Sequence, residues 1–405
     1  MDKNKLSSLL GFFILLNLVL AGVYLRDHFP KANQSGSYPE LAEIKSLPGK
    51  LEVVEKYFKD LADKKGARYA FAVMIHSEIP GNLDMHLLGH ALGDKLYEQE
   101  GLGGITACTD DFRNACSHSI VIGLFLDKGE QALPEIAEAC HKAPGGSGAY
   151  MMCFHGLGHG ILASVGYDME KAVQLCEKTG SRETGECVGG MVMEITGGGF
   201  HDRQLWTEQR KKYLDPSEPA SLCQRSFISA TARPFCLAYI TPYLLEAAGA
   251  DLGNPGPEDF RKAFKFCAQM SASDKVGRNL CAGGFGKEFV VLVRGRDIRK
   301  ESFTRITDKQ LTTVSDWCSL AADGDDAKAC ILSAVNSLFW GGENDRSVAI
   351  RFCTSVPNEA DRSACLENLI GAVGFYISDP SYRKNFCGEI PASYQEKCRS
   401  NLQIN

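Results

Sequence analysis

The chain of 405 residues predicts an all-α protein: disulfide-stapled helical hairpins stacked as an α-solenoid or an α/α ring, behind one N-terminal transmembrane helix. The main observation is that sixteen cysteines fall into eight pairs, with seven to thirteen residues inside a pair and 32 to 51 residues between successive pair starts. One spacing rule kept over most of a chain indicates a repeated structural unit. Regularly placed thiols behind an apolar N-terminal segment also indicate an oxidising compartment.

The first expected element is the apolar run from Leu6 to Leu25, which is long enough to span a bilayer as a helix. A cleaved signal peptide is the alternative, because Val19 and Ala21 would suit a small-residue cleavage site. The run continues past Ala21, so we expect residues 1–25 to form an uncleaved signal-anchor. Residues 26–50, which contain three prolines, then form a flexible linker. The cysteines place the large C-terminal body in the periplasm or the extracellular space.

Each cysteine pair has the same local pattern. The first cysteine ends a short amphipathic segment, as in 133–140, 169–176 and 260–267, where apolar residues recur three and four positions apart. A polar turn follows, and the second cysteine opens an apolar, glycine-containing segment such as 365–376. The unit is therefore predicted to be a helical hairpin stapled near its turn, and each bridge contributes roughly 2–3 kcal/mol. Only seven residues follow Cys398, so the last unit is expected to lack a full second helix.

The histidines do not follow the repeat. Nine are present, and none lies after Ser221. We therefore divide the body into N-terminal helical repeats with a histidine-rich site, 51–205, and C-terminal disulfide-paired repeats, 206–405. The second part is expected to bind a protein or peptide partner or to close the array.

Five histidines recur at positions that one face of the repeats should share. His86 and His90 are four residues apart, which puts both imidazoles on one helical face. His118 and His155 each follow the second cysteine of their unit by two residues, so they should face the same surface. His159 lies one helical turn beyond His155.

These five side chains and one carboxylate predict a metal site. The predicted ligands are His86, His90, His118, His155, His159 and Glu194. Neutral imidazole suits copper, iron and zinc, so the expected cofactor is a transition metal, in one centre or in two adjacent ones. Glu194 is also the predicted catalytic residue, as a bridging ligand or a general base. The alternative is that neutral histidines are satisfied by hydrogen bonds in tight helix packing, and that Glu194 pairs with an arginine.

Other charged residues are weaker candidates. Glu288, with Lys287 beside it, has the same offset from its cysteine as Glu194. Arg294 and Arg296 are candidates for binding an anion, although a solvated helix end is the favoured explanation for them. Asp84 is either a partner for a liganding histidine or an acid at the start of a helix.

Together these patterns predict a membrane-anchored, extracytoplasmic, metal-dependent enzyme. Oxidative chemistry is favoured over hydrolytic chemistry, because few carboxylates are among the candidate ligands. The alternative is a disulfide-rich helical-repeat scaffold for binding or assembly, without catalysis. The expected partners are the membrane, through the N-terminal helix, and a protein or peptide; a net charge of −6 without a long basic run argues against nucleic acid. Histidines converging on one recessed place would favour the enzyme, and an exposed apolar strip would favour the scaffold.

Overall fold

A computed structural model describes residues 38–79, 85–109, 111–197, 203–250, 255–270, 274–293, 306–341 and 345–404. These residues are 79% helical and include no strand, which confirms the all-α prediction. The chain divides into two units, Met1–Glu43 and Ile44–Asn405, and every helix from α3 onward belongs to the second. The predicted anchor at 1–25 lies outside the described residues. Among those described, no helix is long and apolar enough to cross a membrane.

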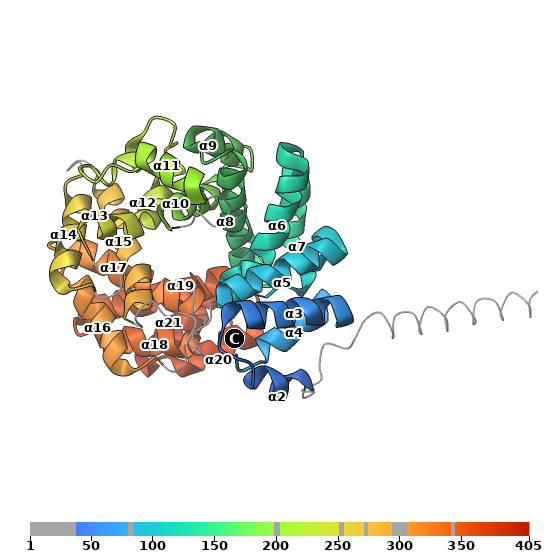
Figure 1. Ribbon diagram of the computed structural model, residues 1–405. Helices are drawn as coiled ribbons and strands as arrows, with labels where there is room; N and C mark the ends of the chain where they lie inside the picture. The colour runs from blue at the N-terminus through green and yellow to red at the C-terminus, as the bar shows by residue number, and fades with distance from the viewer. Residues whose placement is uncertain are drawn as a thin grey trace, which may run out of the picture. The chain divides into compact units, whose positions relative to one another are not determined.

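The second unit is built from α-helices joined by short turns (Figure 1). In chain order the α-helices of the protein are α2 (Glu40–Lys45), α3 (Leu51–Lys65), α4 (Ala67–Ile75), α5 (Met85–Glu100), α6 (Ala115–Lys128), α7 (Leu133–Lys142), α8 (Gly146–Ser164), α9 (Met169–Glu177), α10 (Thr184–Gly197), α11 (Arg203–Tyr213), α12 (Arg233–Tyr239), α13 (Thr241–Ala247), α14 (Pro257–Ala268), α15 (Lys275–Leu292), α16 (Asp308–Cys318), α17 (Gly324–Asn336), α18 (Arg346–Ser355), α19 (Glu359–Tyr376), α20 (Pro380–Glu389) and α21 (Ala392–Leu402). Short 3₁₀ turns are η1 (Gly101–Ala107), η2 (Asp111–Asn114), η3 (Gly129–Ala132) and η4 (Ser221–Gln224), and η6 (Ser337–Gly341) is a π-helical turn.

All eight disulfides have the near-neighbour pairing that the repeat predicts. The bonds are Cys108–Cys116, Cys140–Cys153, Cys176–Cys187, Cys223–Cys236, Cys267–Cys281, Cys318–Cys330, Cys353–Cys365 and Cys387–Cys398. No cysteine in the described part of the chain is left free. The amphipathic segments before the first cysteines are helices α7, α9 and α14, as expected.

Most second helices do not begin at their cysteine, although the sequence predicts that they do; α6 comes closest to the prediction, since it begins one residue before Cys116. Helices α15 and α19 each begin six residues before Cys281 and Cys365, respectively. The reason lies in the polar turn, because the Asp274 and Asn358 side chains accept hydrogen bonds from the first-turn backbone amides. Such N-caps satisfy amides that have no partner within the helix, so they fix where the helix starts.

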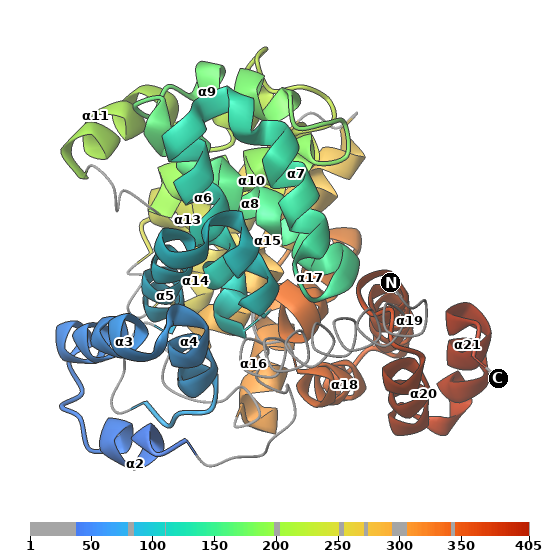
Figure 2. The same cartoon turned by 90° about the vertical axis from the view of Figure 1, so that its right-hand side faces the viewer.

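The last unit also differs from the prediction. Its second helix is not missing: α21 has 11 residues and carries Cys398 close to its end. Like α15 and α19, α21 begins six residues before its cysteine, so most of the helix precedes Cys398 and the short tail after it is no guide to helix length. Figure 2 shows α20 and α21 beside α18 and α19, and α21 packs on both α19 and α20.

The glycine-rich second helices pack one against the next along the chain. Helices α5, α6, α8, α10, α12, α15, α17 and α19 form this series, and α19 also packs against α8. At that return contact two stacked rings lie against α8: Trp340 of η6 stacks on Tyr376 of α19 with centroids 4.9 Å apart, and both rings lie over Gly148 of α8. A Cβ atom on Gly148 of α8 would lie 2.3 Å from Trp340 Cε2, so only glycine fits beneath this stack.

Glycine also brings α8, which carries His155 and His159, into backbone contact with α10, which carries Glu194. A Cβ atom on Gly158 of α8 would lie 1.9 Å from the carbonyl oxygen of Cys187 on α10. A Cβ on Gly190 of α10 would lie equally close, 1.9 Å, to the carbonyl oxygen of His155. Real side chains do not approach backbone atoms this closely, so α8 and α10 require glycine at both points.

Candidate metal centre

Three of the predicted ligands converge between α5 and α6. His86 and His90 lie on α5, and His118 lies on α6. Each of the three rings has a nitrogen atom that lies within 4.8 Å of a nitrogen of both other rings. His86 and His90 are half-buried, whereas His118 is only 3% exposed. Leu88, on the opposite side of α5, is buried in the core and fixes the orientation of the helix.

Hydrogen bonds to the Nδ1 atoms determine which nitrogens face inward. His86 Nδ1 donates to the carbonyl oxygen of Phe112 at 2.7 Å, and a carbonyl can only accept. Ser119 Oγ donates to the His90 carbonyl at 3.0 Å and lies 2.9 Å from His90 Nδ1, from which it accepts. Both neutral rings therefore carry their hydrogen on Nδ1. Their Nε2 atoms lie 3.1 Å apart, and two bare lone pairs at that distance repel unless a cation or a proton lies between them.

The Phe112 carbonyl is positioned by an unusual turn. Phe112, Arg113 and Asn114 are three consecutive non-glycine residues with φ of 54°, 56° and 59°. Left-handed backbone costs such residues roughly 1–2 kcal/mol each, and strained turns of this kind concentrate at functional sites. The turn lies inside the loop closed by the Cys108–Cys116 disulfide, which helps to hold it.

The environment of His118 favours the neutral ring that a metal ligand needs. Burial lowers the pKa of His118 well below its usual 6.5, and the neighbouring His90 and His86 lower it further. Its Nε2 atom is buried and has no hydrogen-bond partner among the described residues. A buried imidazole nitrogen without a partner is costly, and a bound cation would satisfy it.

The other two histidines form an adjacent group with carboxylates of α10. His159 Nδ1 lies 3.1 Å from Glu194 Oε2, and Tyr167 donates to Glu194 Oε1 at 3.1 Å. His155 Nδ1 lies 3.5 Å from Glu186 Oε2, a close contact that does not meet hydrogen-bond geometry and becomes an ion pair only when the ring is protonated. A carboxylate on Nδ1 leaves Nε2 of the ring available for a proton, a ligand or a metal.

The two groups are neighbours, but they are not one coordination sphere. The ring centroid of His118 lies 6.1 Å from that of His155 and 6.4 Å from that of His159. Glu194 contacts His159 and Tyr167 and is not among the residues that converge on the His86/His90/His118 position. Of the six predicted ligands, three thus converge and three lie beside them.

The weaker candidates lie near the second group or outside the described chain. Lys287 forms an ion pair with Glu288, and its ammonium lies 5.2 Å from the centroid of the Tyr239 ring. The Tyr239 ring is itself 4.7 Å from that of His155. The described residues do not include Asp84, Arg294 or Arg296.

Sequence reasoning missed four residues of this region: Glu186, Tyr167, Tyr239 and Arg113. Two of them carry a signal in the sequence. Glu186 precedes Glu194 by eight residues, a spacing that puts both carboxylates on one face of α10. Tyr239 follows the second cysteine of its unit by three residues, close to the offset of two that His118 and His155 share.

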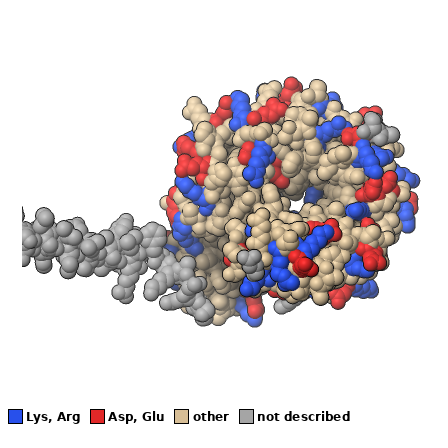
Figure 3. Space-filling model, turned by 180° about the vertical axis from the view of Figure 1, so that it is seen from behind, with Lys and Arg blue, Asp and Glu red and all other residues tan. Residues whose placement is uncertain are grey.

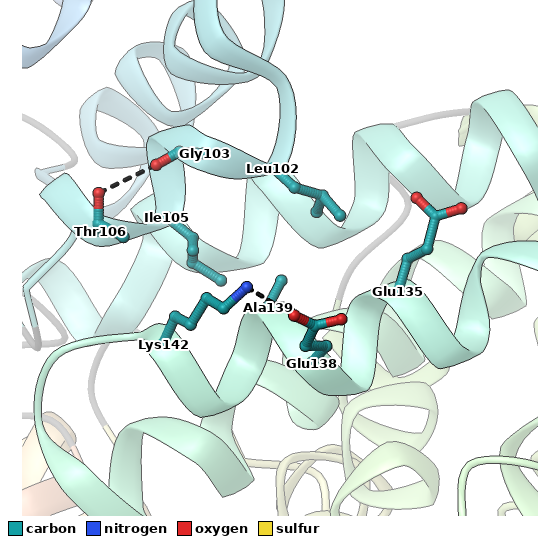
Figure 4. A pocket seen from close by; sticks show the side chains of 8 residues that line it. All are labelled: Leu102, Gly103, Ile105, Thr106, Glu135, Glu138, Ala139 and Lys142. Carbon is teal, nitrogen blue, oxygen red and sulfur yellow. Dashed lines mark hydrogen bonds and ion pairs between the residues drawn. The ribbon is translucent and has the colours of Figure 1, made fainter.

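A pocket at the surface is separate from the histidines. Figure 4 shows it between η1 and α7, with a volume of about 210 Å³ and Lys142 and Glu138 at its edge. These two side chains form an exposed ion pair across one turn of α7. The pocket offers no histidine and no unpaired charge at its rim, so the chemistry of the protein is better sought at the buried histidines.

Comparisons of the chain with known protein families, with curated proteins and with solved structures find no match. Fold and site therefore define the class of protein by themselves. It is an all-α, disulfide-rich protein with five clustered histidines between glycine-packed helices. Ring nitrogens of three of these histidines lie within 4.8 Å of one another, close enough for one metal ion to contact all three.

Acid is expected to destabilise the metal-free protein through these buried histidines. Burial lowers the pKa of His118, and it lowers that of His155 against the opposing effect of Glu186. The unfolded chain therefore takes up protons at a higher pH than the folded one. The contribution of these neutral histidines to the free energy of unfolding is therefore fully present above about pH 6.5. It is lost progressively as the pH falls below that value. Thermal unfolding at about pH 7.5 and pH 5.5 should show this fall, and His118→Gln should reduce it more than the exposed-site control His76→Gln.

Proposed function

We propose that the protein is a metal-dependent enzyme whose centre is one transition-metal ion held by His86, His90 and His118. The observation that carries this proposal is the 3.1 Å approach of two Nε2 atoms whose rings both donate through Nδ1. Three neutral imidazoles leave further coordination positions open, which distinguishes catalytic from closed structural zinc sites. The same ligands also suit copper and iron.

The adjacent histidine group supports hydrolytic over oxidative chemistry. A zinc ion held by three histidines lowers the pKa of a bound water towards neutrality, and such a water needs a proton acceptor. His159 can supply that acceptor, because Glu194 holds its Nδ1 and stabilises the imidazolium that would form. Tyr167 holds Glu194 from its other oxygen, so the carboxylate has one orientation. In this proposal Glu194 positions the base and is not a metal ligand.

Location and architecture form part of the same proposal. Eight disulfides support an extracytoplasmic body, which residues 1–25 would anchor in the membrane. The contact of α19 with α8 supports a closed α/α ring over an open solenoid. In a closed ring the histidines would line the inner side.

The surface gives less support to the scaffold alternative. The large exposed apolar side chains are Val53, Leu126, Val276 and Phe375, and they belong to four different helices of the described chain. The face in Figure 3 mixes acidic and basic side chains among the coloured residues. A scattered distribution of this kind is ordinary for a surface and offers no continuous strip for a partner. A protein or peptide partner for residues 206–405 stays a prediction.

The test is metal content measured by mass spectrometry on the full chain, produced in an oxidising compartment. We expect stoichiometric metal in the wild type and at least a roughly hundredfold loss of affinity in His86→Gln and His118→Gln, since even outer-shell changes cost 10–100-fold. His76→Gln is the matched control, because His76 is exposed and its Nδ1 lies 2.7 Å from the backbone carbonyl oxygen of Ala72 in its own helix, away from the other histidines. Zinc would direct the search to hydrolytic assays, and copper or iron to oxidative ones. A folded, disulfide-bonded wild type that takes up none of the three metals would refute the proposal.

A further inference from the structure

Arg113 carries a charge that nothing in the described unit neutralises. It is the middle residue of the left-handed turn that also positions His86 through the Phe112 carbonyl. Its Nε atom is buried and has no hydrogen-bond acceptor, and no carboxylate of the described residues forms an ion pair with it. A partly buried guanidinium without an anion costs folding free energy, so a protein that keeps one usually gains from it elsewhere.

The turn η2, which contains Arg113, packs against α8, the helix that carries His155 and His159 of the second histidine group. Burial raises the pKa of Tyr239 well above 10, and the nearby Arg113 is close enough to oppose that rise. The Tyr239 ring packs 4.7 Å from His155, and its hydroxyl lies 3.4 Å from Glu186 Oε2. The second cation beside Tyr239 is Lys287, which Glu288 already neutralises. Glu186 is within 4 Å of His155 and not of Arg113, so the guanidinium has no carboxylate partner in the part of the chain that the structure describes.

A second buried donor in this part of the molecule also lacks an acceptor. Trp340 Nε1 is buried without a partner among the described residues. Its ring stacks on Tyr376. Burial raises the pKa of the Tyr376 hydroxyl, and the nearby negative charge of Glu186 raises it further, as it does for Tyr239. Arginine and indole N–H groups can only donate, so whatever satisfies them must bring acceptor atoms. Two donor-only groups without acceptors indicate a ligand rich in oxygen.

We propose that Arg113 binds the oxyanion group, a carboxylate or a phosphate, of a substrate that reaches the metal centre. This deepens the proposed function by assigning an anionic substrate class to the same site. The planar guanidinium matches two oxygens of either group in a bidentate pair. The turn connects binding to the centre directly, because Arg113 follows the residue whose carbonyl accepts from His86 Nδ1.

The experiment measures anion binding to the metal-free full chain by calorimetry, with inorganic phosphate and with succinate as separate probes. Metal-free protein is used because a metal ion could itself bind an anion. We expect one of the two anions to bind, which distinguishes phosphate from carboxylate chemistry. Arg113→Gln should weaken that binding at least about tenfold, as is typical for loss of a charged hydrogen bond. The anion affinity of Arg113→Lys should lie between those of the wild type and Arg113→Gln. Arg182→Gln is the matched control, since Arg182 is also without a carboxylate partner but is exposed.

A second readout separates a binding role from a structural one. Without anion, Arg113→Gln should keep or raise the melting temperature, because an uncompensated buried charge has been removed. With anion, only the wild type and the Arg182 variant should gain stability. Binding of neither anion, or equal binding by wild type and Arg113→Gln, would overturn the proposal. Because the protein is metal-free, this result is independent of metal content. A failure to bind anions would leave the proposed metal site standing, and a failure to bind metal would leave the proposed anion site standing.

Discussion

Replacing Gly158 by alanine is expected to destabilise the protein by about 3 kcal/mol or more and to disrupt the histidine group. The added Cβ would lie 1.9 Å from the carbonyl oxygen of Cys187, and backbone cannot yield as a flexible side chain can. Helices α8 and α10 would have to separate, which would pull His159 away from Glu194. Urea unfolding followed by circular dichroism measures the loss of stability directly.

The matched control is Gly371→Ala. Gly371 is exposed inside α19, and a Cβ there would meet nothing within 4 Å. Alanine is a better helix residue than glycine, so this variant should gain about 0.5–1 kcal/mol. If Gly158→Ala unfolded at the same urea concentration as wild type, α8 and α10 could not be in backbone contact. The close approach of α8 and α10, on which the position of His159 beside Glu194 depends, would then be refuted.

The hairpins could be predicted from the sequence because their determinants are local. The distance between paired cysteines, the apolar spacing before the first one and the polar turn all lie within about thirty residues, and together they specify helix, turn and bridge. The cysteine spacing does not locate the starts of the second helices, because the capping side chains Asp274 and Asn358 set them six residues before the cysteine. The final hairpin follows the same rule: α21 begins six residues before Cys398, so the length of chain after that cysteine does not limit the helix.

The site could be predicted only in part. Four-residue spacing places His86 and His90 on one face in any helix. Repeat equivalence groups His118 with His155, whereas the structure brings its ring nitrogen together with those of His86 and His90. The role of Glu194 depends on how α8 and α10 pair, which no local pattern encodes. The importance of Arg113 rests on what is absent around it, and a sequence cannot show that a charge lacks a partner. The left-handed turn was equally hidden, because none of its three residues is glycine.

Removing the Cys108–Cys116 disulfide is expected to weaken metal binding as well as folding. The bond closes a loop of sequence separation 8 that contains the left-handed turn at Phe112 to Asn114. Its loss should cost about 2–3 kcal/mol of stability by the chain-entropy model. Freed from the loop, the strained turn can relax, and the Phe112 carbonyl then no longer orients His86. Loss of such an outer-shell partner should lower metal affinity roughly 10–100-fold, measurable by competition with a chromophoric chelator.

The pair Cys353→Ala/Cys365→Ala is the control for Cys108→Ala/Cys116→Ala. The Cys353–Cys365 bond closes a somewhat longer loop, of separation 12, between α18 and α19. Removing it should cost at least as much stability and leave metal affinity unchanged, because none of the three ligands lies on those helices. Equal loss of metal in both double variants would mean that affinity only follows global stability. Unchanged affinity in both would mean that the turn keeps its conformation without the bond, and His86 would then owe its orientation to the packing of α5 alone.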